Sequence, residues 1–275
     1  MDHGTQVEIE LEARYLRGRQ SVDDYLEQTA IANPHVTLHY RAPDGREEHY
    51  PAAVRTLPPV PREVRPHPYG VELGVLIKML QDTKARSVQQ FLTSEFSRVS
   101  PRVARAIIET AGLRKNARAK SVSGEDAKAI YHAIQQTKVL APATDCVVPI
   151  GEDKLIAGLR QVVDAAFYAA SSRRPAVYRG NPFVIEAALA YGRPEKAARN
   201  SGAGPGGAEA AAGHESPGED DGDEGKLAKL IRFANRVPLQ YQQGAGAIYK
   251  AVAGLNWKSY GLNQGRGALP SGELT

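Results

Sequence analysis

Six prolines crowded into one short stretch interrupt this chain, so that no continuous helix or strand can run through it. Each proline fixes its own φ angle and lacks the backbone donor that both structures need. The stretch is therefore expected to be a linker and a domain boundary, and the 275 residues suffice for two or three small domains. The prolines are Pro51, Pro58, Pro59, Pro61, Pro66 and Pro68.

The sequence before the linker begins with a strand pattern followed by a helix pattern. Residues 6–15 alternate valine, isoleucine and leucine with glutamate, a period of two that is typical of a half-buried strand. Ser21 and Asp24 have the spacing of a capping box, which predicts a helix from there to about Ala32.

A hairpin is expected between residues 36–40 and 46–50. The pair Asp44-Gly45 between them supplies the positive φ angle that a tight turn requires. Residues 1–64 thus combine sheet and helix. Because the first strand would start almost at residue 1, we expect the sequence to open inside a domain.

Beyond the linker the apolar period becomes helical. Ser100 and Pro101 are typical of an N-cap and a first helical position, Gly112 is typical of a helix end, and Ser123 opens another capping box. Residues 65–142 are therefore expected to form a small all-helical domain. The expected helices cover about residues 71–83, 87–96, 101–111 and 123–136.

Residues 143–275 predict an α/β domain interrupted by an acidic insert. Residues 195–225 carry eight carboxylates against two cations among many glycines and alanines, so we expect a disordered surface insert there. Its glycine run, 202–207, is not followed by the Gly-Lys-Ser/Thr of a phosphate-binding loop. No regular element is expected in the tract after Tyr260, and the sequence is also expected to be cut at its C-terminal end. The expected elements are helices near 152–163 and 246–254 and strands over 176–179 and 183–190, with ordered segments over 227–233 and 236–241.

The charge of the chain is unevenly distributed. The whole sequence carries a formal charge of only +4. Residues 65–142, however, contain 13 basic and 6 acidic side chains, a surplus of +7. The loop 113–120 concentrates four cations without an acid, which suits contact with a phosphate backbone rather than reading of bases. An ordinary solvated basic face remains the alternative. The four cations are Arg114, Lys115, Arg118 and Lys120.

Catalytic and metal-binding patterns are missing from the sequence. No Ser/His/Asp or Cys/His set is recognisable, and the single Cys146 indicates a reducing, cytoplasmic compartment. His35 and His39 have the spacing of a zinc helix but fall in an expected strand. No apolar run approaches the roughly 18 residues that a membrane helix needs. We therefore expect no catalytic residue, no metal site and no membrane segment.

Four strings in this sequence together resemble the B-subunit family of DNA topoisomerase VI, an archaeal type IIB enzyme. The likeness covers nearly the whole chain except the acidic insert. The helical part is also similar to the helix-two-turns-helix of formamidopyrimidine-DNA glycosylases, in Ala111-Gly112-Leu113 with Arg118, Ser123 and Glu125. The four strings are residues 70–80, 90–96, 178–183 and 233–239.

The resemblance implies three domains and a function. Residues 1–64 would be the C-terminal part of a GHKL ATPase domain. Residues 65–142 would be a helix-two-turns-helix DNA-binding domain, and residues 143–275 the first part of a ribosomal-protein-like transducer domain. The intact enzyme would be an A2B2 heterotetramer of two A and two B subunits that uses ATP and Mg2+. It would trap one duplex DNA and pass it through another that the A subunits cut. The chain alone, without the remaining ATPase motifs, is expected to bind no cofactor and to be inactive.

The resemblance also implies roles for individual residues. Gly4 and Thr5 resemble the last nucleotide motif of the GHKL fold, which supports the adenine pocket. The run 15–20 resembles a basic DNA-contacting loop, although Gln20 stands where a third basic residue is common. Residues 257–260 match the family's Trp-Lys-x-Tyr motif, whose aromatic residues are equally consistent with core packing. The implied DNA contacts in these two motifs are Arg17, Arg19 and Lys258.

Two other functions stay open at this point. The chain could be a free-standing helix-two-turns-helix module that binds nucleic acid without a topoisomerase partner. It could also be a structural scaffold, in which case the cations of the loop 113–120 would not affect nucleic-acid affinity.

Overall fold

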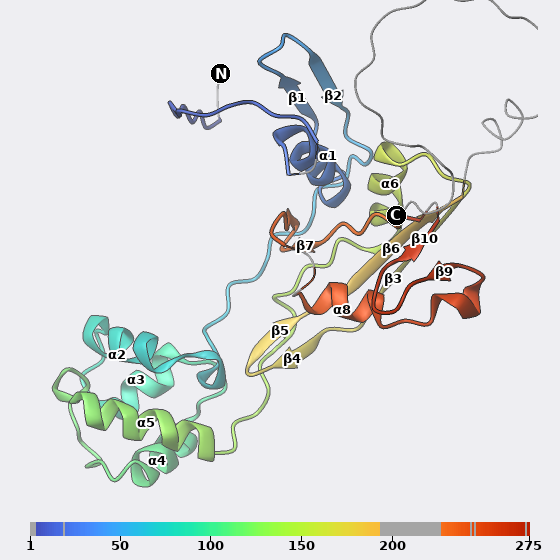
Figure 1. Cartoon of the computed structure of the whole chain (residues 1–275). Helices are drawn as coiled ribbons and strands as arrows, with labels where there is room; N and C mark the ends of the chain where they lie inside the picture. Colours follow the sequence, from blue (N-terminus) through green and yellow to red (C-terminus); the bar gives the residue numbers. More distant parts are fainter. Residues whose placement is uncertain (1–3, 19, 193–226, 243, 245, 273) are drawn as a thin grey trace, which may run out of the picture. The chain divides into compact units, whose positions relative to one another are not determined.

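The computed structural model describes residues 4–18, 20–192, 227–242, 244, 246–272 and 274–275 (Figure 1). It contains both helices and small two-stranded sheets, which confirms the expected mixture of α and β structure. The chain forms two compact units. The helical unit comprises residues 58–149 and 172–186, and the mixed unit comprises residues 1–57, 150–171 and 187–275. Compared with the expected helical domain 65–142, the helical unit also contains residues 58–64, 143–149 and 172–186.

The helical unit contains four α-helices, each of which begins within two residues of its predicted start. Serine side chains cap three of them: Ser87 accepts from the Gln90 amide at 3.2 Å, and Ser100 precedes a proline at the first helical position. Ser123 forms the expected capping box with Asp126. The helices are α2 (Leu73–Asp82), α3 (Val88–Glu95), α4 (Pro101–Thr110) and α5 (Gly124–Gln136), with short 3-10 turns η1 (Pro68–Gly70) and η2 (Ala119–Ser121).

The core of the helical unit draws on all four α-helices. Leu76, Phe91, Ile107 and Ile130 come one from each helix, and each is at most 1% exposed. Phe91 also meets Phe96 edge to face, with ring centroids 5.6 Å apart. Such continuous burial supplies the main driving force for folding this unit. The unit also contains the antiparallel pair β4 (Ala176–Tyr178) and β5 (Asn181–Phe183).

The mixed unit has a smaller core between α1 (Val22–Ala32) and α6 (Glu152–Val162). Ile31 and Leu159 are buried there together with Ala190. Gly158 lets the two backbones approach, because a Cβ at this position would overlap the carbonyl oxygen of Ile31. The remaining elements of this unit are β1 (Leu38–Arg41), β2 (Glu47–Tyr50), β3 (Phe167–Ser172), β6 (Glu186–Tyr191), β7 (Phe233–Ala234), β8 (Val237–Pro238), α8 (Ala247–Ala253), η3 (Trp257–Tyr260), β9 (Asn263–Gln264) and β10 (Pro270–Ser271).

The hairpin and the first helix of this unit agree with the sequence prediction. Gly45 has φ +85° in the turn between β1 and β2, which pair antiparallel. The Ser21 hydroxyl accepts from the Asp24 amide at 3.2 Å, as expected for an N-cap. The Asp24 carboxylate accepts from the amide of Gln20 rather than from that of Ser21, so only half of the capping box forms.

Several sequence predictions are wrong in detail. Residues 6–15 form no strand: no described strand lies beside them to complete a ladder, and Val7 and Leu11 are 76% and 73% exposed. The strand expected over 183–190 is interrupted, because it begins in β5 and resumes only in β6. The sequence analysis missed β3, and it missed the β9–β10 pair after Tyr260. The expected insert 195–225 lies outside the described residues.

None of the helices in the described part of the chain is long and apolar enough to span a bilayer.

Candidate nucleic-acid interface

The basic loop, residues 113–120, is fixed to the helical core by its own small and apolar residues. Ala119 is 1% exposed, and Leu113 and Ala117 pack against the same core. The Val88 amide at the start of α3 donates to the Ala117 carbonyl at 2.9 Å, and the Ala119 amide donates to the Arg86 carbonyl at 3.3 Å. These bonds form an antiparallel bridge, so the loop has a defined backbone rather than a free one.

The cations of the basic loop point outward from this anchored backbone. All four side chains are exposed, whereas the small and apolar residues between them face the core. None of them forms an ion pair with a described residue. Because these hydrogen bonds already fix the loop backbone, it loses little further conformational entropy when its cations bind a polyanion. The loop therefore has the geometry and charge of a phosphate contact at Arg114, Lys115, Arg118 and Lys120.

Lys84 and Arg86 extend this basic surface, and the sequence analysis did not single them out. They alternate with the buried Thr83 and Ala85, so their side chains are exposed. The backbone bridge between Ser87 and Arg118 brings this segment beside the basic loop. The alternation of small and basic residues over 83–86 is a signal that could have identified them.

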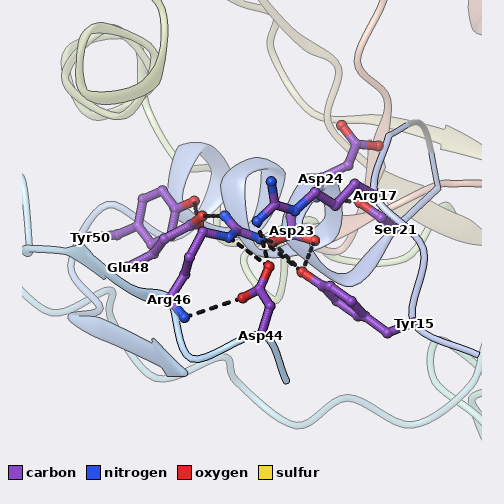
Figure 2. Close-up of polar contacts among 9 residues, drawn as sticks. All are labelled: Tyr15, Arg17, Ser21, Asp23, Asp24, Asp44, Arg46, Glu48 and Tyr50. Atoms are coloured by element: carbon purple, nitrogen blue, oxygen red, sulfur yellow. Dashed lines mark hydrogen bonds and ion pairs between the residues drawn. The ribbon is translucent and has the colours of Figure 1, made fainter. Parts of the chain in front are cut away.

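Arg17, an expected DNA contact, lies instead in a polar cluster of the mixed unit (Figure 2). Its guanidinium forms an ion pair with Asp44 at 2.5 Å. Asp44 belongs to the β1–β2 turn and also pairs with Arg46 at 3.0 Å. A phosphate would therefore have to compete with Asp44 for Arg17.

Arg46 is the centre of this cluster. Besides Asp44, it pairs with Asp23 at 3.1 Å and with Glu48 at 2.5 Å. The hydroxyl of Tyr15 donates to Asp23, and that of Tyr50 donates to Glu48 at 2.9 Å. Desolvation, followed by these carboxylate bonds, raises the pKa of both phenols. The cluster joins the segment before α1 to α1 and the hairpin, which indicates a structural role.

The Trp-Lys-x-Tyr motif forms the 3-10 turn η3. The indole N–H of Trp257 donates to the Val252 carbonyl at 2.8 Å, and its ring is half-buried. Lys258 is exposed, has no ion-pair partner among the described residues, and precedes Tyr260, which is 77% exposed. Trp257 thus holds the turn, whereas Lys258 and Tyr260 are available to a ligand.

The residues expected near a nucleotide do not form a pocket by themselves. Gly4 and Thr5 are exposed in an extended segment, and a Cβ at Gly4 would meet nothing within 4 Å beyond its chain neighbours. Arg19 lies outside the described residues. No group of three or more potential metal ligands occurs in the part of the chain that the structure describes.

The chain is similar to known proteins over most of its length. Residues 142–273 match the family model of the topoisomerase VI B subunit transducer. The B subunit of type 2 DNA topoisomerase 6 from Methanosarcina barkeri is 38% identical over 98% of this chain and 39% of its own length. The corresponding proteins of Archaeoglobus fulgidus and Methanothermobacter thermautotrophicus are 36% and 34% identical, over 98% and 94% of this chain and 40% and 46% of their own lengths. The chain therefore spans less than half the length of these relatives, yet the matches include both compact units. The chain belongs to the B-subunit family of DNA topoisomerase VI.

Proposed function

We propose that this chain is the DNA-contacting and relay portion of the B subunit of a DNA topoisomerase VI. The basic loop would grip the phosphate backbone of a duplex DNA. The transducer portion would pass ATP-driven closure of two B subunits to the A subunits, which would cut a second duplex. This activity supports relaxation and decatenation of DNA in the cytoplasm, and the assembly would be an A2B2 heterotetramer.

The domain assignment is part of the same proposal. Residues 1–64 would complete a GHKL ATPase domain. Residues 65–142, whose helices α2–α5 form the four-helix body, would be a helix-two-turns-helix domain, and residues 143–275 would begin the transducer. ATP and Mg2+ would serve the intact enzyme. Because Gly4 and Thr5 alone do not make a nucleotide pocket, we expect no ATP turnover by this chain in isolation.

One observation carries the proposal: the basic loop combines a backbone bonded to the start of α3 with four exposed cations that have no ion-pair partner among the described residues. Unpaired cations that lie close together repel one another. When they bind DNA, the release of counterions from the phosphates supplies free energy that outweighs this repulsion. The binding energy of such an array depends steeply on salt concentration, whereas a solvated surface of paired charges would show little dependence.

A salt titration of duplex DNA binding tests the proposal. The variant combines Arg114→Ala, Lys115→Ala, Arg118→Ala and Lys120→Ala. Each phosphate contact contributes about 0.9 to the slope of log affinity against log salt, so losing four should lower the slope by up to about 3.6. Fluorescence anisotropy with a labelled duplex measures both affinity and slope.

Arg62→Ala is the matched control. Arg62 is an exposed cation of the same unit, but it already pairs with Asp145 at 2.8 Å. We expect this variant to leave the slope nearly unchanged. An unaltered slope in the four-residue variant would show that the basic loop does not contact DNA, and that its cations are only a solvated face.

A further inference from the structure

The β4–β5 hairpin belongs to the transducer match by sequence but to the helical unit by its contacts. Residues 172–186 lie within the matched range 142–273, yet they form one compact unit with residues 58–149. The tip of the hairpin, Arg179-Gly180, is where the two strands turn. The hairpin is therefore not part of the four-helix body, but it belongs to the same compact unit as the basic loop.

Two glycines make the joint between the hairpin and the helical body. A Cβ at Gly180, which has φ +75°, would lie 2.6 Å from Nδ1 of His67. A Cβ at Gly70 would lie 2.9 Å from Oδ1 of Asn181 and 3.0 Å from the Arg179 carbonyl oxygen. Backbone packed this closely on backbone and on a buried ring fixes the hairpin tip in position.

His67 is itself held in place on the body side of this joint. Its side chain is 4% exposed, and its Nε2 lies 2.9 Å from the Leu140 carbonyl oxygen. Its Nδ1 accepts from the Tyr69 amide at 3.3 Å. The Tyr69 hydroxyl donates to the Thr137 carbonyl and accepts from the Val139 amide at 2.9 Å. The hairpin tip therefore rests on a rigid surface.

The segment 172–185, which comprises the β4–β5 hairpin and the residues that flank it, is strongly cationic. Arg173, Arg174 and Arg179 are exposed, and none of the three forms an ion pair with a described residue. Residues 172–185 contain no acid. The Arg179 guanidinium lies 5.5 Å from the ring centroid of Tyr178, whose side chain is 64% exposed. Stacking on the ring orients this guanidinium while its donors stay open to solvent.

We infer that the β4–β5 hairpin is a second phosphate-binding element, which contacts the same duplex DNA as the basic loop. This inference rests on the proposed function and identifies a further part of its DNA surface. Arginine forks match phosphate oxygens bidentately, and three of them without an acid form a polyanion contact rather than a site for a neutral peptide. The compact unit as a whole carries 17 basic against 9 acidic side chains, which favours DNA over any cationic or neutral partner.

The test compares duplex binding by the full chain and by a variant combining Arg173→Ala, Arg174→Ala and Arg179→Ala. Losing three phosphate contacts should lower the salt slope by up to about 2.7. The corresponding three-lysine variant keeps the charges and should restore most of the slope. Arg62→Ala again serves as the control.

A second variant tests the joint without changing charge. Gly180→Ala brings a Cβ into His67 at a backbone angle that L-residues rarely adopt, so it should displace the hairpin tip. We expect weaker DNA binding and a lower salt slope in this variant, with the circular dichroism of the four-helix body retained.

The outcomes separate this inference from the proposed function. If the basic-loop variant loses affinity while the three-alanine variant keeps the full slope, the hairpin is not a DNA contact and the basic loop remains one. If the three-alanine variant loses slope while the basic-loop variant does not, the hairpin is a DNA contact and the proposed role of the basic loop fails.

Discussion

At the scale of single residues, His67 is a buried titratable group held by hydrogen bonds from both ring nitrogens. Burial lowers its pKa below the ordinary value of 6.5; the bond to Leu140 opposes this shift, and the nearby Arg98 adds to it. The neutral ring suits its bonds, because one nitrogen must accept from the Tyr69 amide while the other donates. Protonation would place a hydrogen on the accepting nitrogen, which would then face the Tyr69 amide N–H, so that two donors would oppose each other.

The stability of the helical unit should therefore fall as the pH is lowered. Well above pH 6.5 the histidine is neutral in both the folded and the unfolded chain, so its contribution is constant. Below pH 6.5 the unfolded chain binds a proton that the folded chain resists, and the free energy of unfolding decreases. Urea midpoints between pH 7.5 and pH 5 would measure this decrease.

His67→Asn should reduce this pH dependence, even though it also lowers stability at neutral pH. His132→Asn is the matched control, because His132 is an exposed histidine of the same unit on α5. We expect it to keep the wild-type pH profile. A His67 variant with an unreduced pH dependence would place the titrating group elsewhere.

At the scale of elements, the close crossing of α1 and α6 depends on Gly158, a residue without a side chain. Gly158 on α6 leaves room for the backbone of Ile31 on α1, and a Cβ there would also lie 3.0 Å from the Ile31 carbonyl carbon. The neighbouring atoms belong to helical backbone and cannot rotate away. Gly158→Ala should therefore cost about 1–3 kcal/mol in the mixed unit, despite the better helix propensity of alanine.

Thermal unfolding measures this cost. Gly74→Ala is a suitable control, because Gly74 lies in α2 and a Cβ there would meet nothing within 4 Å. We expect it to be neutral or stabilising. An unchanged or raised melting temperature in Gly158→Ala would mean that the two helices can separate without loss.

Elements were predicted well where the signal is local, and poorly where it depends on a distant partner. Ser100, Ser123 and Asp44-Gly45 determine caps and a turn through their own backbone neighbours, and each lies where expected. The strand expected over residues 6–15 needed a pairing strand that the described residues do not provide. The charge count of residues 65–142 located the basic loop, but no local pattern indicated that residues 172–186 join the same unit.

At the scale of the whole molecule, the two units have cores of very different size. The helical unit buries a large cluster around Phe91, whereas the mixed unit buries a small one around Ile31 and Leu159. Buried apolar area largely determines the free energy of unfolding. We expect two calorimetric transitions, with the helical unit unfolding at the higher temperature.

Two substitutions assign the transitions. Phe91→Ala should cost about 3–5 kcal/mol and move the upper transition, since Phe91 is fully buried in the helical unit. Gly158→Ala should move the lower one. A single transition that both substitutions shift equally would contradict the assignment of one core to each unit.

The tyrosine and histidine bonds between residues 67–69 and 137–140 bring the beginning and the end of the four-helix body together. Because the two ends of this stretch lie side by side, a short linker could replace the whole stretch and still join the chain before it to the chain after it. The four-helix body can therefore change in length or in its helices without moving the two positions at which it joins the rest of the chain.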